Sequence, residues 1–255
     1  MAASATTDDL VQARLLAETA VVQPGGTAWV ALHLTMKKGW HTYWRNPGDS
    51  GQKTEIAWTL PAGFNAGGIH WPVPQKFDAG IGASYGYTGE TALLVPVSVP
   101  ASAKPGPVEL AADVNWLVCE AICVPGEAKL SLTLDVGPAP MPDAATKALF
   151  DRTRAALPGD IKAPARAKAS ESEIVLELPG EALKGIADPV AAFMPFDDTL
   201  IDHAAPQASK GATLALKRGR VQSKLPAETA GLLLVEDAKT GAKRAFNLTV
   251  QLRTE

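Results

Sequence analysis

Cysteine is scarce in this sequence, with only two in 255 residues, and its four histidines and four methionines form no clustered ligand motif. No apolar run approaches the roughly 18 residues of a membrane span, and residues 1–9 lack the basic and apolar regions of a signal peptide. The net charge of -3 argues against nucleic acid or an anionic membrane as the main partner. We expect a soluble chain cut from a longer secreted or membrane-attached parent, because it starts in a polar segment and stops on a strand-like end.

Tryptophan and tyrosine are missing from the second half of the chain, since all six tryptophans and all three tyrosines precede residue 117. Residues 136–142 contain three prolines, which continue neither a strand ladder nor a helix and favour a semi-rigid linker. We therefore predict a first domain over residues 1–137 and a second over residues 143–255.

The first domain has the alternating apolar and polar pattern of half-buried strands. Turn signals separate the runs, such as the Asn-Pro-Gly sequence at residues 46–48. The expected strands cover residues 11–22, 28–36, 55–60, 92–99, 108–118 and 130–136. Short strands at this spacing predict an antiparallel β-sandwich.

The second domain opens with a helix that Asp143 can cap and that Pro158 and Gly159 end. Apolar residues recur there at helical spacing, and β patterns then return. The strands expected in this half cover residues 173–178, 213–216, 232–236 and 244–252, the last two joined as a hairpin. With no cysteine and one histidine, His203, this half is predicted to be a second sandwich that spaces or docks the first. The predicted fold class is mainly β, with two antiparallel sandwiches joined by the proline-rich linker and a short helix.

Cys119 and Cys123 are separated by three residues. A disulfide needs Cα atoms about 4.4–6.8 Å apart, whereas four steps along a flat strand span about 13 Å, so the chain is expected to fold back here. In the preceding strand, Cys119 continues the parity of the polar positions Asp113 and Asn115. The first sulfur is therefore expected to face out of the core, within reach of another thiol.

Three functions remain open for this pair from its spacing: a redox-active disulfide, a structural staple and a metal site. A ring this small stabilises a fold by only about 2 kcal/mol on the loop-entropy model. A chain of this length also buries an adequate core without bridges. Both arguments favour the redox pair over the staple without excluding it.

Two other stretches are unusual. Tryptophan, histidine, tyrosine and arginine crowd residues 40–45, where they predict either core packing or the wall of a partly buried site. Residues 70–77 lead into the glycine-rich segment 78–89, which contains Tyr85 and Tyr87. Its glycines predict a loop that can move, and it is either a plain surface loop or a flap beside the cysteines.

These stretches, taken together, resemble a known family. The motifs in order are HTYWRNPGDSG at 41–51, WPVPQKF at 71–77, YGYTGE at 85–90 and WLVCEAICVPG at 116–126. Over about residues 10–136 they resemble the amino-terminal periplasmic domain of transmembrane thiol:disulfide reductases, the group containing DsbD and ScsB, the suppressor of copper sensitivity protein B. The spacing of the cysteines resembles the ScsB branch, which carries a second immunoglobulin-like module. The resemblance implies two immunoglobulin-like sandwiches.

The resemblance also implies a function, that of a protein-disulfide reductase acting as one domain of a larger membrane protein. Such a domain receives electrons from the thioredoxin-like carboxy-terminal domain of the same protein and passes them to periplasmic thioredoxin-like partners. A reversible Cys119–Cys123 disulfide carries the electrons, and no cofactor is required. The implied location is the periplasm, as part of an inner-membrane protein that touches the membrane only through the missing part of the parent.

The resemblance and the sequence together give the candidate site residues. By analogy with the family, Cys123 is the sulfur that meets partners. Glu120 lies between the cysteines and is either a proton acceptor or a solvated loop residue, while Tyr43 and His41 are candidates for a supporting role. The family's protective cap loop maps onto about residues 77–85, with Phe77, Ile81 and Tyr85 as its candidate residues.

A binding protein is the rival class. Two thiolates with His41, His70 or Met36 nearby suit Cu(I), a soft ion, and the copper-sensitivity association of the resemblance supports this alternative. A purely structural module with a stapling disulfide is the remaining alternative.

Overall fold

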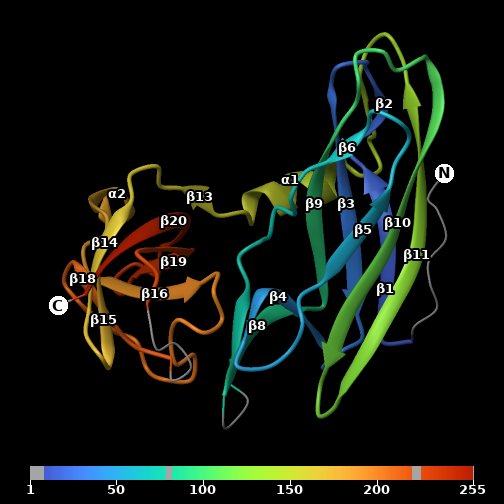
Figure 1. Cartoon of the computed structure of the whole chain (residues 1–255). Coiled ribbons are helices and arrows are strands. Elements are labelled where there is room, and N and C mark those ends of the chain that lie inside the picture. The colour runs from blue at the N-terminus through green and yellow to red at the C-terminus, as the bar shows by residue number, and fades with distance from the viewer. Residues whose placement is uncertain (1–8, 79–81, 220–224, 255) are drawn as a thin grey trace. The chain divides into compact units, whose positions relative to one another are not determined.

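The computed structural model describes residues 9–78, 82–219 and 225–254. Contacts divide the chain into two units, each described by itself below; they are residues 1–44, 52–75 and 86–157 for the first, and 45–51, 76–85 and 158–255 for the second. Both are rich in β-sheet (Figure 1), which confirms the mainly β prediction. Neither helix in the described part of the chain has the length and hydropathy that a membrane crossing requires.

Strands β1 to β12 form two sheets. One sheet has the order β1-β3-β9-β6, and the other has the order β12-β2-β11-β10-β4-β8-β7, with β5 also paired to β10. Their bounds are β1 Val11–Ala17, β2 Thr19–Val22, β3 Thr27–Met36, β4 His41–Gly48, β5 Glu55–Thr59, β6 Asn65–Ala66, β7 Gln75–Asp78, β8 Ala83–Thr88, β9 Glu90–Ser98, β10 Gly106–Cys119, β11 Cys123–Val136 and β12 Met141–Pro142. The single strand expected over residues 11–22 is wrong, because the chain passes from one sheet to the other at Glu18.

The longest hairpin is formed by β10 and β11 (Figure 1). Its antiparallel register runs from the pair Gly106–Val136 to the pair Cys119–Cys123. Side chains alternate along both strands as the sequence predicts, with every second residue of 110–118 and 128–136 buried. Burial of these apolar faces fixes the register, because a slip of one residue would turn each face to solvent. The register therefore brings the two cysteines directly opposite each other at the end of the hairpin.

Helix α1 (Lys147–Ala155) packs on the four-stranded sheet. Leu149 and the fully buried Phe150 contact the sheet residues Ala31, Ala92 and Leu94. The contact division therefore groups this helix with the first unit, whereas the sequence analysis placed it in the second domain.

The capping prediction for this helix is wrong. The N-cap residue is Thr146, and the Asp143 carboxylate instead accepts a hydrogen bond from the backbone N–H of Ala145 in the preceding turn. An Asp side chain that bonds two residues ahead stabilises a turn and competes with the helix start. The helix consequently begins several residues later than the sequence indicated.

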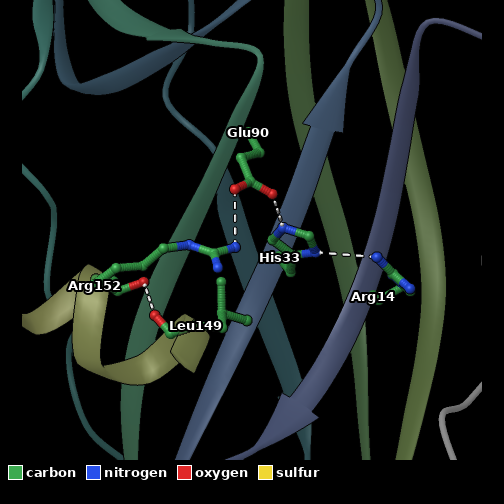
Figure 2. Close-up of polar contacts among 6 residues, drawn as sticks. Arg14, His33, Glu90, Leu149 and Arg152 are labelled. Atoms are coloured by element: carbon green, nitrogen blue, oxygen red, sulfur yellow. Dashed lines mark hydrogen bonds and ion pairs between the residues drawn. The ribbon is translucent and has the colours of Figure 1, made fainter. Parts of the chain in front are cut away.

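A polar cluster around the buried His33 ties helix α1 to the sheet beneath it (Figure 2). His33 on β3 is 5% exposed, and its Nε2 lies 3.1 Å from the carboxylate of Glu90 on β9. That carboxylate also accepts a hydrogen bond of 2.8 Å from Arg152 on the helix. On the other side, Arg14 of β1 lies 3.4 Å from Nδ1 of His33. Since Nδ1 accepts from a guanidinium, the proton of the neutral imidazole sits on Nε2 and is donated to Glu90.

Acidification should weaken the folded state through His33. Burial lowers the pKa of His33; the hydrogen bond to Glu90 opposes this shift, and the charges of Arg14 and Arg152 add to it. The unfolded chain takes up this proton near pH 6.5, and the folded protein only at lower pH. The contribution to stability is therefore full above that value and is lost as the pH falls below it. Urea unfolding at about pH 7.5 and about pH 5.5 measures the loss.

The variant His33→Gln keeps an N–H donor for Glu90 but cannot titrate, so its unfolding free energy should change less between the two pH values. His41→Gln should also reduce the change, because burial lowers the pKa of His41 too, and the double variant should reduce it further. Equal changes in the wild type and in His33→Gln would contradict the assignment.

The second unit contains one continuous sheet of eight strands in the order β16-β19-β20-β14-β15-β18-β17, with β13 also paired to β20. Its elements are β13 Gly159–Asp160, β14 Ala165–Ala169, β15 Glu173–Glu177, α2 Gly180–Leu183, β16 Pro189–Pro195, β17 Ala208–Lys210, β18 Thr213–Lys217, β19 Glu228–Asp237 and β20 Lys243–Thr254. The predicted hairpin of the last two strands is confirmed. Pairing is not antiparallel throughout, because β14 and β13 run parallel to β20. The apolar faces of these strands enclose a core of their own around Phe193, Leu214 and Leu233.

Candidate functional site

The two cysteines form a disulfide at the end of the β10–β11 hairpin. Their Cα atoms are 4.2 Å apart, as cross-strand partners in the ladder. The backbone N–H of Glu120 donates a hydrogen bond of 3.1 Å to the carbonyl of Ile122 and closes the turn. The prediction that the chain folds back between the cysteines is confirmed.

The two sulfur-bearing residues differ sharply in exposure. Cys119 is 2% exposed, whereas Cys123 is an exposed residue. The expectation that Cys119 faces out of the core is therefore wrong. Along β10 the neighbouring strand changes from β5, which pairs as far as Asn115, to β4, which pairs from Val118. A two-residue period describes one regular strand in one environment, and it fails where the environment changes. A partner protein can reach the disulfide through Cys123.

Tyr43 on β4 brings a hydroxyl to the sulfur of Cys123. Its hydroxyl lies 3.8 Å from Sγ of Cys123, and the residue is 3% exposed. Burial raises the pKa of Tyr43 above its ordinary value, because the interior disfavours the phenolate. The hydroxyl therefore keeps its proton at neutral pH and can donate it in a hydrogen bond to the sulfur.

His41, two residues earlier on β4, pairs with Cys119 in the ladder and contacts the ring of Tyr43 edge to face at 5.1 Å. Burial lowers the pKa of His41, so the imidazole is neutral at neutral pH. A neutral ring places no positive charge beside the cysteines. The structure thus places both predicted supporting residues, His41 and Tyr43, beside the two cysteines.

Glu120 is exposed, and its carboxylate lies directly over Gly39. Gly39 has a positive φ of 91°, which other residues rarely adopt, and an added Cβ would collide with the Glu120 carboxylate. The positive φ favours glycine here, whereas the collision alone is mild because the exposed Glu120 side chain can move aside. Glu120 is at the site, on its solvent side.

The candidate cap residues lie in the second contact unit. Phe77 is partly buried on β7, and Tyr85 is buried on β8, where its hydroxyl lies 3.1 Å from Nδ1 of His203. Ile81 lies outside the described residues. The expectation of a loop throughout the glycine-rich segment is wrong, because residues 83–88 form β8; Gly86 is required there, since an added Cβ would strike the carbonyl oxygen of Thr42.

Two of the three residues suggested for Cu(I), His70 and Met36, contact other side chains, whereas His41 lies beside the cysteines. His70 contacts the ring of Trp29 edge to face at 5.0 Å, and the sulfur of Met36 accepts a hydrogen bond of 3.9 Å from Thr42. A search of the described residues for three or more clustered His, Cys, Asp or Glu side chains that could hold a metal ion finds none.

The sequence analysis missed two features of this hairpin. Ile122, inside the turn, is 67% exposed. Trp116 is 2% exposed, and its indole lies on Gly126, its cross-strand partner. The side chain of any other residue at position 126 would overlap the indole. A large apolar residue in the turn between the cysteines, and a glycine within a strand, are the sequence signals that could have revealed them.

Comparison with known proteins identifies a family and a solved structure of similar fold. The family model for the N-terminal domain of the thiol:disulfide interchange protein DsbD matches residues 10–135. The chain is 20% identical to the crystal structure of the N-terminal periplasmic domain of ScsB from Proteus mirabilis, with a TM-score of 0.67 and coverage of 97% of each chain. This likeness shows that the fold is shared across both units.

Other comparisons add little. The crystal structure of BcpA, the major pilin subunit of Bacillus cereus, is 9% identical with a TM-score of 0.29, covering 96% of this chain and 70% of the pilin. That score is too low to support an argument. A search of curated protein sequences found no match. Through residues 10–135, the chain belongs to the family of DsbD amino-terminal domains, whose chemistry is thiol-disulfide exchange.

Proposed function

We propose that this chain relays electrons between thioredoxin-like proteins through a reversible Cys119–Cys123 disulfide. The donor is the thioredoxin-like carboxy-terminal domain of the same parent membrane protein, and the acceptors are soluble thioredoxin-like proteins of the periplasm. The chain acts there as the protein-disulfide reductase domain of an inner-membrane protein. We assign this role to residues 1–137, which hold both cysteines, and no redox role to residues 143–255.

The observation that carries the proposal is the unequal exposure of the two cysteines at the end of one hairpin. A staple needs neither sulfur at the surface, whereas an exchange reaction needs one sulfur that a partner can attack and one that the partner cannot reach. Cys123 supplies the first and Cys119 the second.

The domain is reduced in two displacements. A donor thiolate attacks Sγ of Cys123, and the Cys119–Cys123 bond breaks with its electron pair passing to the Cys119 sulfur, which takes up a proton. The donor's second thiolate then attacks the donor sulfur that is bonded to Cys123. Cys123 leaves and, with a proton, becomes a thiol. The domain gains two electrons and two protons, and the donor becomes a disulfide.

Delivery of the electrons reverses these roles. The Cys123 thiolate attacks the disulfide of the acceptor, whose leaving sulfur takes a proton. Cys119 then attacks Sγ of Cys123, which re-forms the internal disulfide and expels the reduced acceptor. No other redox group enters either half-reaction.

Tyr43 assists the two steps in which the Cys123 sulfur is a thiolate, its release by the donor and its attack on the acceptor. Its hydroxyl lies at the exposed sulfur, and a hydrogen bond to a thiolate stabilises the thiolate over the thiol. Because burial keeps Tyr43 protonated, the donor is present over the whole neutral range. His41 packs against the ring of Tyr43 and holds it in place.

Reduced thioredoxin should convert the disulfide of the full chain to a dithiol, and oxidised thioredoxin should reverse the reaction. Alkylation of free thiols followed by mass spectrometry gives the rate in each direction. The domain should stay folded when it is reduced, since loss of so small a ring costs only about 2 kcal/mol. Cooperative unfolding measured with and without reductant checks this.

Two results would contradict the proposal. The first is a disulfide that dithiothreitol reduces but thioredoxin does not. The second is loss of cooperative unfolding in the reduced protein, because a domain that melts whenever it is reduced cannot pass its electrons on.

A further inference from the structure

The turn between the two cysteines presents a large apolar side chain to solvent. Ile122 is 67% exposed; the other large apolar side chains exposed among the described residues are Met141 and Val190, each at 54%. A single exposed apolar residue needs no explanation on most surfaces. This one is bonded directly to Cys123, the exposed member of the disulfide.

The turn holds Ile122 in this outward position. The disulfide joins the residues that bracket the turn, and the hydrogen bond from the N–H of Glu120 fixes the carbonyl of Ile122. An isoleucine side chain is also stiff at its first torsion, so it loses little freedom when a partner covers it. The side chain is therefore prearranged for a contact that the isolated chain does not make.

We propose that Ile122 is the apolar anchor by which a redox partner docks while it exchanges disulfides with Cys123. The partner is a protein whose reactive cysteine lies beside an apolar surface patch. This inference rests on the proposed function and names the surface that selects the partner for it.

The geometry of the mixed disulfide carries the argument. Disulfide-bonded residues have Cα atoms about 4.4–6.8 Å apart, and the Cα of Ile122 is about 3.8 Å from that of Cys123. Any protein joined to Cys123 must therefore come within one residue's length of Ile122, whose exposed side chain lies at the edge of that contact. A partner whose rim, the surface around its reactive cysteine, is apolar gains binding free energy when it covers Ile122. A polar or charged rim there loses its hydration without gaining a hydrogen bond.

The charge of the turn further restricts which proteins can dock at Cys123. Glu120 is exposed in the same turn, and its carboxylate is on the solvent side of the site. A partner with an acidic rim would meet this carboxylate at short range, where like charges repel. The expected partner therefore has a rim that is apolar and either neutral or basic.

The test is the variant Ile122→Ser in the full chain, with reduced thioredoxin as the protein reductant and dithiothreitol as a small reductant without a docking surface. Reduction by thioredoxin should slow about ten-fold, the effect of losing part of the burial of one isoleucine. Reduction by dithiothreitol should be unchanged. Ile122→Leu, which remains apolar, should retain most of the thioredoxin rate.

Met141→Ser is the matched control, because it removes an equally large exposed apolar side chain from the other end of the hairpin. Met141 lies on β12, which pairs with β2 beside the Val136 end of β11. Thirteen residues of strand place that end about 43 Å from Cys123. Both rates should be unchanged in Met141→Ser.

The outcomes separate the inference from the proposed function. An unchanged thioredoxin rate in Ile122→Ser would overturn the docking role and leave the exchange function standing. Equal slowing with both reductants would also overturn it, because Ile122 would then shape the disulfide itself. If thioredoxin fails to reduce even the wild type while dithiothreitol succeeds, the proposed function fails and the docking role falls with it.

Discussion

Cys119→Ser should accumulate a covalent complex with a thioredoxin-like partner, while Cys123→Ser should form almost none. The partner for this experiment is a thioredoxin whose second active-site cysteine is replaced and whose remaining cysteine is activated as a mixed disulfide with a small thiol. In Cys119→Ser, the exposed Cys123 attacks that sulfur, and no neighbouring thiol remains to release the adduct. In Cys123→Ser, the only thiol is 2% exposed, and an approaching protein cannot reach it.

The expected difference in the rate of adduct formation is roughly a hundred-fold or more, since exchange requires direct contact of sulfur atoms. Non-reducing gels and mass spectrometry measure it. The double variant, with serine at both positions, is the control for non-specific coupling. Equal yields from the two single variants would contradict the assigned roles, and an adduct through Cys119 alone would reverse them.

The second large effect is expected near the cysteine end of the hairpin, three residues from Cys123. Gly126→Ala should lower the free energy of unfolding by about 1–3 kcal/mol, the usual cost of overpacking a well-packed interior. The new Cβ would overlap Nε1 of Trp116, and the indole is 2% exposed, so any shift must be made within the core. Urea unfolding followed by tryptophan fluorescence measures the change.

Gly68→Ala is the matched control, because an added Cβ there meets no atom within 4 Å and the residue does not have a positive φ. Its stability should be unchanged or slightly raised. Combining Gly126→Ala with Trp116→Leu should cost less than the sum of the two single changes, since the smaller side chain relieves the overlap. Additive losses would show that the glycine is not required by the indole.

The long hairpin was predictable because its information is local. Alternation of apolar and polar residues along β10 and β11 identifies their buried faces, and the short spacing of Cys119 and Cys123 requires a turn between them. The same reasoning failed for the exposure of Cys119, because the strand changes its neighbour from β5 to β4 just before the cysteine. The alternation of apolar and polar residues along β10 contains no information about which strand pairs with it.

The contacts around the exposed sulfur were less accessible from sequence. Tyr43 and Cys123 are 80 residues apart in the chain, and their approach depends on the pairing of β4 with the end of β10. The resemblance to a family selected Tyr43 and His41 as candidates, and only the pairing shows that both lie at the disulfide. The hydrogen bond between Tyr85 and His203 joins residues even further apart, and no motif in the second half of the chain indicates it.

The central claim is that the disulfide is a carrier of electrons, and its redox potential tests this most directly. Full-length protein is equilibrated in glutathione buffers of graded ratio, or against thioredoxin if glutathione does not reduce it, and the oxidised fraction is counted by alkylation and mass spectrometry. The account predicts a potential within the range of about -120 to -270 mV found for exchange proteins. A potential below about -300 mV would mark a structural staple and contradict it.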